Sequence, residues 1–66
     1  MTVREALGYA KEELEDAGIF EAAMDAKYLL MEVAGLSSAE LFFAAERKLE
    51  EGTVQKYRAV IERRRA

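Results

Sequence analysis

The 66-residue sequence contains no cysteine, histidine, proline, tryptophan or asparagine. Without cysteine and histidine there is no disulfide scaffold, no Cys/His zinc site and no Ser-His-Asp or Cys-His catalytic set. No apolar run approaches the roughly 20 residues that a transmembrane helix needs, and no signal-peptide pattern opens the chain. The sequence therefore predicts no membrane partner and none of these catalytic or metal-binding arrangements.

Composition and length point to one small folded domain. Hydrophobic residues make up 52% of the chain and charged residues 35%, which is typical of a helical domain rich in Ala, Glu and Leu. A core of this size supplies only ~3–5 kcal/mol of net stability. The chain also has little material for the concave pocket of an active site. We therefore expect a single domain, residues 1–66, that is not an enzyme by itself.

Charge is distributed unevenly along the chain. The net charge is −3, but residues 1–51 carry −7 and residues 52–66 carry +4. A basic end can mark an interaction surface, which makes Arg63, Arg64 and Arg65 the candidate partner-binding residues. The simpler interpretation, which we prefer, is that basic residues favour a helix C-terminus because of the helix dipole. The negative overall charge argues against nucleic acid as a partner.

Capping signals and apolar periodicity predict the helices. Residues 2–5 read Thr-Val-Arg-Glu and residues 37–40 read Ser-Ser-Ala-Glu, and both are capping boxes. Gly18 and Gly35 suit the left-handed position that follows a helix end. Together with the periodicity, these signals predict helices over 3–17, 21–34, 38–45 and 54–64. Thr53 is the predicted cap of the last helix, and the segment 46–52 is predicted to be a loop or single turn pinned by Leu49.

The predicted core follows apolar stripes on these helices. The stripe residues are Val3, Leu7, Ala10, Leu14 and Ala17, then Ala23, Ala26, Leu30 and Val33, then Val54, Tyr57 and Ile61, with Leu41 and Phe42 pointing inward. Gly8 interrupts the first helix, and we interpret it as a point of close approach by a neighbouring helix. Short connections favour antiparallel neighbours. The predicted fold class is therefore all-α, a small bundle of four to five helices with short loops.

No residue stands out as catalytic, cofactor-binding or metal-binding. The acidic clusters at 12–16 and 50–51 lack the spacing of a calcium loop and are interpreted as solvated helix faces. The tyrosines are interpreted as packed rings with hydrated hydroxyl groups. Asp25 lies among residues that are predicted to be buried. It is either a favourable charge at a helix start or the partner of an arginine in the last helix.

The order and spacing of several landmarks resemble a known family. The series consists of Leu7 and Leu14, Ala17-Gly18-Ile19, Asp25-Ala26, Leu29-Leu30, Gly35-Leu36-Ser37, Leu41, Leu49, Tyr57, Ile61 and Arg63-Arg64. It resembles the N-terminal helical domain of the HemK/PrmC family, the peptide chain release factor glutamine methyltransferases. The resemblance covers the chain from Thr2 to Arg65. Five helices are usual in that family, and the region around residues 45–49 would supply the short additional one.

The resemblance implies a function that the residues alone do not. In the family this domain precedes a Rossmann-like methyltransferase domain, which transfers a methyl group from S-adenosylmethionine to the Gln of the Gly-Gly-Gln motif of class 1 release factors. The family's Asn-Pro-Pro-Tyr motif belongs to that second domain, and a chain without Asn and Pro lacks it. The implied role of residues 1–66 is to recognise the release factor, as a cytoplasmic monomer without a cofactor of its own. The implied partners are a class 1 release factor and the C-terminal methyltransferase domain.

Two alternatives stay open. The chain is alternatively an independent helical protein-interaction module without a methyltransferase partner, which docks or dimerises through an apolar stripe with Phe43 or Met31 as its anchor. A third hypothesis is binding to RNA or the ribosome through residues 56–65. The affinity of such binding would have to fall markedly as the salt concentration rises.

Overall fold

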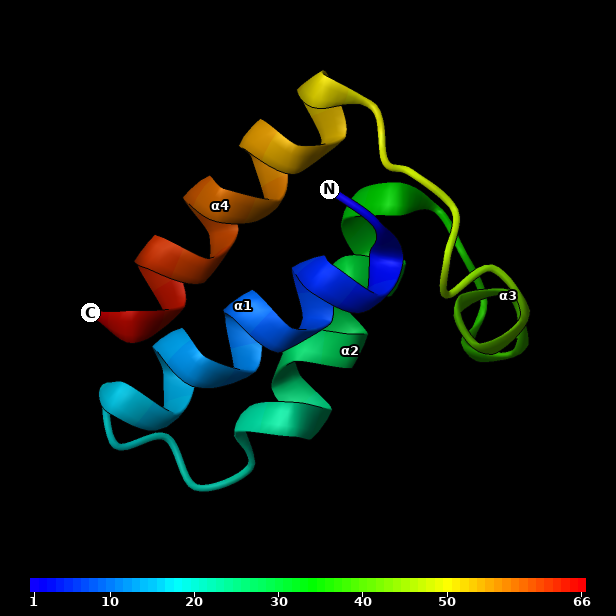
Figure 1. Cartoon of the computed structure of the whole chain (residues 1–66). Coiled ribbons are helices and arrows are strands. Elements are labelled where there is room, and N and C mark those ends of the chain that lie inside the picture. Colours follow the sequence, from blue (N-terminus) through cyan, green and yellow to red (C-terminus); the bar gives the residue numbers. More distant parts are fainter.

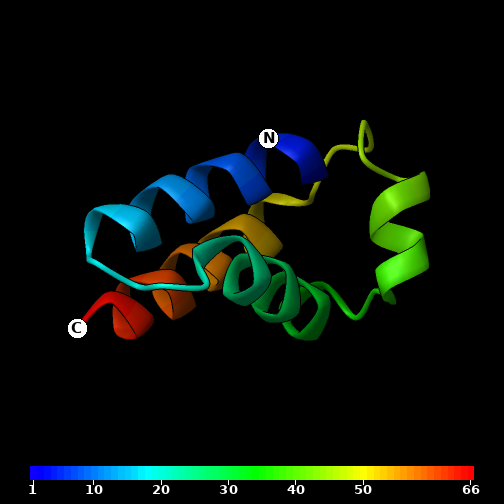
Figure 2. The same cartoon turned by 90° about the horizontal axis from the view of Figure 1, so that it is seen from below.

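The computed structural model describes all 66 residues and consists of four helices. They are α1 (Val3–Asp16), α2 (Ala22–Ala34), α3 (Ser38–Phe43) and α4 (Glu51–Arg65). Helices α1, α2 and α4 pack against one another, and the short α3 stands across one end of this group (Figures 1 and 2). The radius of gyration is 10.7 Å, close to the about 11 Å expected for a compact domain of this length. The predicted all-α bundle is confirmed.

Both predicted capping boxes are present. The Thr2 hydroxyl accepts a hydrogen bond of 3.1 Å from the Glu5 N–H, and the Glu5 carboxylate accepts one of 2.8 Å from the Thr2 N–H. Ser37 and Glu40 repeat this reciprocal pair with the same two distances. The backbone N–H donated to each carboxylate lowers the pKa of Glu5 and of Glu40 below the ordinary value. The two helix starts are therefore determined by local sequence.

The segment between α3 and α4 completes the capping of α1. The N–H groups of Val3 and Arg4 donate to the carbonyl oxygens of Arg47 and Ala45, at 3.0 and 2.9 Å. A helix leaves its first N–H groups without partners inside the helix, so these bonds satisfy two of them. The segment runs antiparallel to the N-terminus, with an isolated bridge between Thr2 and Lys48. It is therefore a structural strap, and not only a loop that Leu49 pins.

The prediction for the start of the last helix was wrong. Helix α4 begins at Glu51, and its N-cap Glu50 makes no side-chain capping hydrogen bond. The strap ends at Leu49, whose N–H donates to the Met1 carbonyl at 2.9 Å, and the chain turns into the helix directly after it. Glutamates at this end also suit the positive pole of the helix dipole. Thr53 consequently lies within the first turn of α4 and does not cap it.

The core lies between α1, α2 and α4. Its buried cluster consists of Val3, Ala6, Ala10, Leu14, Ala22, Ala26, Leu30, Leu41, Tyr57 and Ile61. Alanines on α1 and α2 allow these two helices to approach closely, and the larger side chains fill the remaining space. Of the predicted stripe positions, Ala17, Ala23 and Phe42 are exposed, whereas Leu7 and Val33 are partly buried against the core cluster. Since adjacent residues cannot share one helix face, Leu41 takes the inward position of α3.

Tyr57 departs from the expectation of a hydrated tyrosine. Its ring is buried, and its hydroxyl donates a hydrogen bond of 2.7 Å to the Ala26 carbonyl oxygen. Burial raises the pKa of Tyr57 far above the ordinary value of 10 because it disfavours the charged phenolate. The hydrogen bond joins α4 to α2 within the core, so the buried hydroxyl has a partner.

Candidate partner-binding surface

A groove of about 660 Å³ opens between α1, α2 and α3. Its apolar lining consists of Leu7, Ala23, Leu41, Phe42 and Ala45. Gly8 of α1 lies beside them, and a Cβ added at Gly8 would meet no atom within 4 Å. The predicted close approach at Gly8 is therefore wrong, and the missing side chain widens the groove instead. The volume lies within the roughly 300–1,000 Å³ usual for binding pockets, which makes the groove the first candidate site.

The charged residues that line the groove are all basic. They are Arg4 and Lys11 from α1 and Lys27 from α2. The Arg4 guanidinium pairs with the Glu46 carboxylate at 2.7 Å. The Lys11 ammonium lies 3.9 Å from the Glu15 carboxylate. Lys27 has no carboxylate partner in the chain, and its ammonium lies 5.8 Å from the ring centre of Tyr28. The charged side chains that line the groove are therefore cationic in a protein whose net charge is −3, and Lys27 is the one that no carboxylate offsets.

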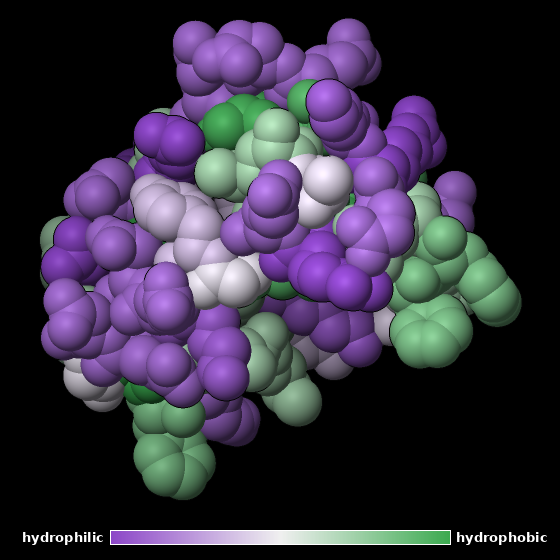
Figure 3. Space-filling model, in the orientation of Figure 1, coloured by the Kyte–Doolittle hydropathy of each residue, from purple (hydrophilic) through white to green (hydrophobic).

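Large aromatic side chains extend the apolar surface beyond the groove. Phe42 and Phe43 are 78% and 84% exposed, and their rings pack edge to face with centres 5.5 Å apart. Phe20, in the connection between α1 and α2, is 99% exposed. Figure 3 shows hydrophobic surface at the place of α3 and at the end where α1 connects to α2. Clustered apolar exposure such as that of Phe42 and Phe43 often marks an interaction site, whereas the surface at the α1–α2 connection is a separate patch (Figure 3).

The two anchor candidates of the interaction-module hypothesis have different surroundings. Phe43 is exposed, as an anchor for a partner has to be. Met31 is partly buried and packs against the core cluster. Of the two, only Phe43 offers a large apolar side chain to a partner.

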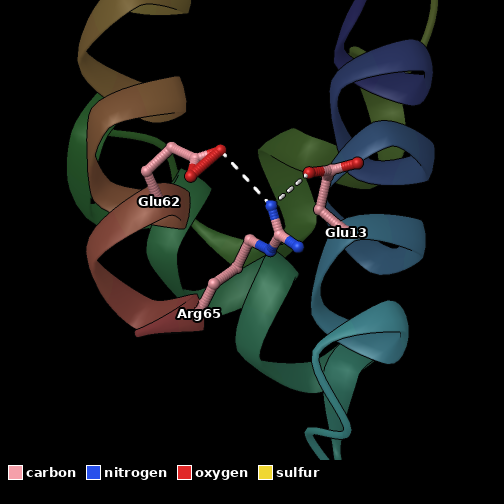
Figure 4. Close-up of polar contacts among 3 residues, drawn as sticks. All are labelled: Glu13, Glu62 and Arg65. Carbon is pink, nitrogen blue, oxygen red and sulfur yellow. Dashed lines mark hydrogen bonds and ion pairs between the residues drawn. The ribbon is translucent and has the colours of Figure 1, made fainter.

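The arginines at the end of α4 make intramolecular ion pairs. Arg65 lies 3.1 Å from Glu13 of α1 and 3.5 Å from Glu62 (Figure 4). Arg64 contacts Asp25 of α2 at 2.9 Å, so the ion pair that was one of two interpretations of Asp25 is present. Asp25 also lies in the first turn of α2, where a negative charge is favourable.

These pairs bear on the basic end as a candidate surface. Arg64 and Arg65 hold α4 against α2 and α1, whereas Arg63 is exposed and forms no ion pair in the chain. The Nε atom of Arg65 is buried without a hydrogen-bond partner. Partner binding by Arg63, Arg64 and Arg65 stays a prediction, and Arg63 is the one whose charge is free for a partner.

The remaining titratable groups form a cation–π contact between Arg58 and Tyr9 and no metal-binding cluster. The Arg58 guanidinium lies 5.5 Å from the ring centre of Tyr9, and burial is the main cause that raises the pKa of Tyr9. No group of three or more Asp, Glu, His or Cys side chains is arranged to hold a metal ion. None of the helices combines the length and apolar character that crossing a membrane requires. The groove and the aromatic surface offer apolar contacts and cationic side chains to a ligand.

Three packed helices with a basic-rimmed apolar groove and exposed aromatic residues are typical of small helical interaction domains. Comparison with known families shows which family this chain comes from: the family model of the PrmC N-terminal domain matches residues 5–66. The chain belongs to this family, which confirms the resemblance seen in the sequence. No curated protein and no solved structure matches the chain.

Sequence reasoning missed the groove itself. Ala23 and Phe42 were predicted to lie in the core, and Gly8 was predicted to contact a neighbouring helix, but all three line the groove. A signal was present at Gly8, since a glycine inside a helix costs about 1 kcal/mol relative to alanine. The groove itself depends on where α3 stands, and no local pattern encodes that position.

Proposed function

We propose that this chain is the substrate-recognition domain of an S-adenosylmethionine-dependent protein-glutamine methyltransferase, and that it binds class 1 peptide chain release factors. The observation that carries the proposal is the match of residues 5–66 to the PrmC N-terminal domain. The exposed apolar groove and aromatic surface support it, because recognition of a large protein needs surface rather than titratable chemistry.

The domain would act by positioning its substrate. Binding the body of the release factor raises the effective concentration of the Gly-Gly-Gln motif at a methyltransferase domain linked to the same chain. The buried cluster and the hydrogen bond of Tyr57 hold α1, α2 and α4 together, which supports a docking surface of fixed shape. A rigid surface loses less conformational entropy on binding.

The methyl donor belongs to the methyltransferase domain in this proposal. The four glycines of the chain, at positions 8, 18, 35 and 52, are too dispersed to form a phosphate-cradling loop. The proposal assigns neither S-adenosylmethionine binding nor methyl transfer to these 66 residues. Because release factors act in translation termination, the proposed place of action is the cytoplasm.

Competition against a full-length family enzyme tests the proposal. Excess chain should bind the release factor and raise the apparent KM of the enzyme for it, while kcat stays constant. Methylation of a short Gly-Gly-Gln peptide serves as the control, because such a peptide lacks the surface that the domain would recognise. An unchanged KM, together with no heat of binding when the chain is titrated with release factor, would contradict the proposal.

The exposed Phe42–Phe43 pair favours one further candidate function, that of an independent helical module that self-associates. Two copies that bury these rings against each other would remove large apolar side chains from water. Sedimentation equilibrium distinguishes the two functions. A monomer up to millimolar concentration argues against self-association, whereas dimers that Phe43→Ser abolishes would favour it.

A further inference from the structure

We propose that the groove between α1, α2 and α3 is the docking site for an acidic segment of the partner protein, one that presents a large apolar side chain with carboxylates beside it. Since it rests on the proposed function, this inference takes the segment to belong to the class 1 release factor. It assigns to the groove a role that the family match does not specify.

The interior of the groove fits an apolar side chain. Leu7 of α1 and Leu41 of α3 both line it, and Ala23 of α2 contributes only a methyl group. Gly8 leaves further room, because nothing lies within 4 Å of where its Cβ would be. A side chain that enters this space would remove apolar surface from water on both partners, at roughly 25 cal/mol per Å².

The rim determines the charge of the occupant. Arg4, Lys11 and Lys27 surround the apolar lining, and no acidic residue lines the groove. Lys27 has no carboxylate partner in the chain, so its charge is available to an incoming one. Arg4 pairs with Glu46 and Lys11 with Glu15, but these side chains are all well exposed, and such pairs contribute little stability. An acidic segment therefore meets three cations at little cost in intramolecular pairing.

The surroundings favour a protein segment over a small molecule. On α3, Phe43 extends the apolar surface past the wall that Phe42 forms. On α2, Met24 and Tyr28 are exposed next to Lys27 and follow each other at a spacing of four residues, along one helix face. Exposed aromatic side chains thus neighbour two of the residues that line the groove, Phe42 and Lys27, and a partner that covers them as well is larger than a small molecule.

Two pairs of matched variants, titrated with a class 1 release factor by isothermal calorimetry, test the inference. Lys27→Glu reverses a rim charge, and Lys56→Glu makes the same change on the exposed face of α4, away from the groove. Gly8→Leu fills the groove, and Gly52→Leu adds the same side chain to α4, where a Cβ also meets nothing. Circular dichroism checks that each variant is folded. If Gly8→Leu does not fold, the comparison of Lys27→Glu with Lys56→Glu decides the test alone.

We expect the two groove variants to bind at least tenfold more weakly than the parent chain, and the two α4 variants to bind within twofold of it. Raising the salt from 50 to 300 mM should weaken the binding of the parent chain to the release factor several-fold. The binding of Lys27→Glu should weaken less, because fewer ion pairs remain to be screened. Binding that all four variants retain equally would overturn the groove as the site while leaving the proposed function intact. No binding by the parent chain would overturn both.

Discussion

The hydroxyl of Tyr57 on α4 lies 2.7 Å from the carbonyl oxygen of Ala26 on α2 and donates a hydrogen bond to it inside the core. Tyr57→Phe keeps the ring but removes the donor, so we expect the free energy of unfolding to fall by about 1–2 kcal/mol. Thermal unfolding would shift down by roughly 4–8 °C for each kcal/mol in a domain of this size. Tyr28→Phe is the matched control, because Tyr28 is exposed and its hydroxyl makes no hydrogen bond in the chain. Equal melting of the two variants would show that the buried bond adds nothing.

The same buried hydroxyl predicts a loss of stability in alkali. An unfolded tyrosine ionises near pH 10, whereas burial raises the pKa of Tyr57 well above that value in the folded chain. Stability that depends on the protonated hydroxyl is therefore complete below pH 10 and is lost as the pH rises past it. Melting temperatures measured from pH 8 to 11 should fall more steeply for the parent chain than for Tyr57→Phe. Parallel curves would refute the prediction.

The pair formed by Asp25 and Arg64 is expected to make a small, salt-sensitive contribution. Both side chains are partly exposed, with the carboxylate oxygen 2.9 Å from the guanidinium. A double-mutant cycle with Asp25→Ala and Arg64→Ala should give a coupling energy of about 0.5–1 kcal/mol at low salt. In 1 M salt the Debye length is about 3 Å, and the coupling should shrink. Strict additivity of the two substitutions at low salt is the result that would exclude the contribution.

The two capping glutamates predict acid sensitivity. Backbone N–H donation lowers the pKa of Glu5 and of Glu40 in the folded chain below the ordinary 4.5. Their stabilising effect is present above the pKa of the unfolded chain and is lost as the pH falls through the lowered folded value. Glutamine keeps the capping oxygen without the titration. The melting temperature of the double variant Glu5→Gln, Glu40→Gln should therefore fall less between pH 5 and 3 than that of the parent chain. An equal fall in both would contradict this account.

Alanine substitutions at two glycines should change stability in opposite directions. Gly8 lies within α1 with open space around it, so Gly8→Ala should stabilise the chain by about 0.5–1 kcal/mol. Gly18 has a φ of 81°, a left-handed conformation that disfavours any Cβ. Gly18→Ala should destabilise the chain by about 1–2 kcal/mol. Urea unfolding measures both changes in the free energy of unfolding. If both substitutions changed it in the same direction, the helical role of Gly8 or the left-handed role of Gly18 would be wrong.

Local sequence accounts for most of the helix positions. The two capping boxes, with partners three residues apart, position the starts of α1 and α3 as predicted. Gly18 and Gly35 adopt positive φ values after α1 and α2, as the sequence indicated. Each of these signals acts within about one turn of backbone, so it can be recognised without knowledge of the tertiary contacts. The start of α4 was misplaced because the strap, bonded to the N-terminus, determines it across more than 40 residues of sequence.

The candidate site was far less predictable than the helices. Asp25 was paired with an arginine of the last helix in one of two interpretations, but residue patterns did not say which arginine or whether the pair forms. Gly8, Ala23 and Phe42 come together in the groove only because α1 packs on α2 and α3 stands across one end of the bundle. Composition, periodicity and caps are one-dimensional properties, and they determined an all-α domain and its family likeness. A groove is a relationship between surfaces that are distant in the chain, so its shape and charge arise only when the helices pack.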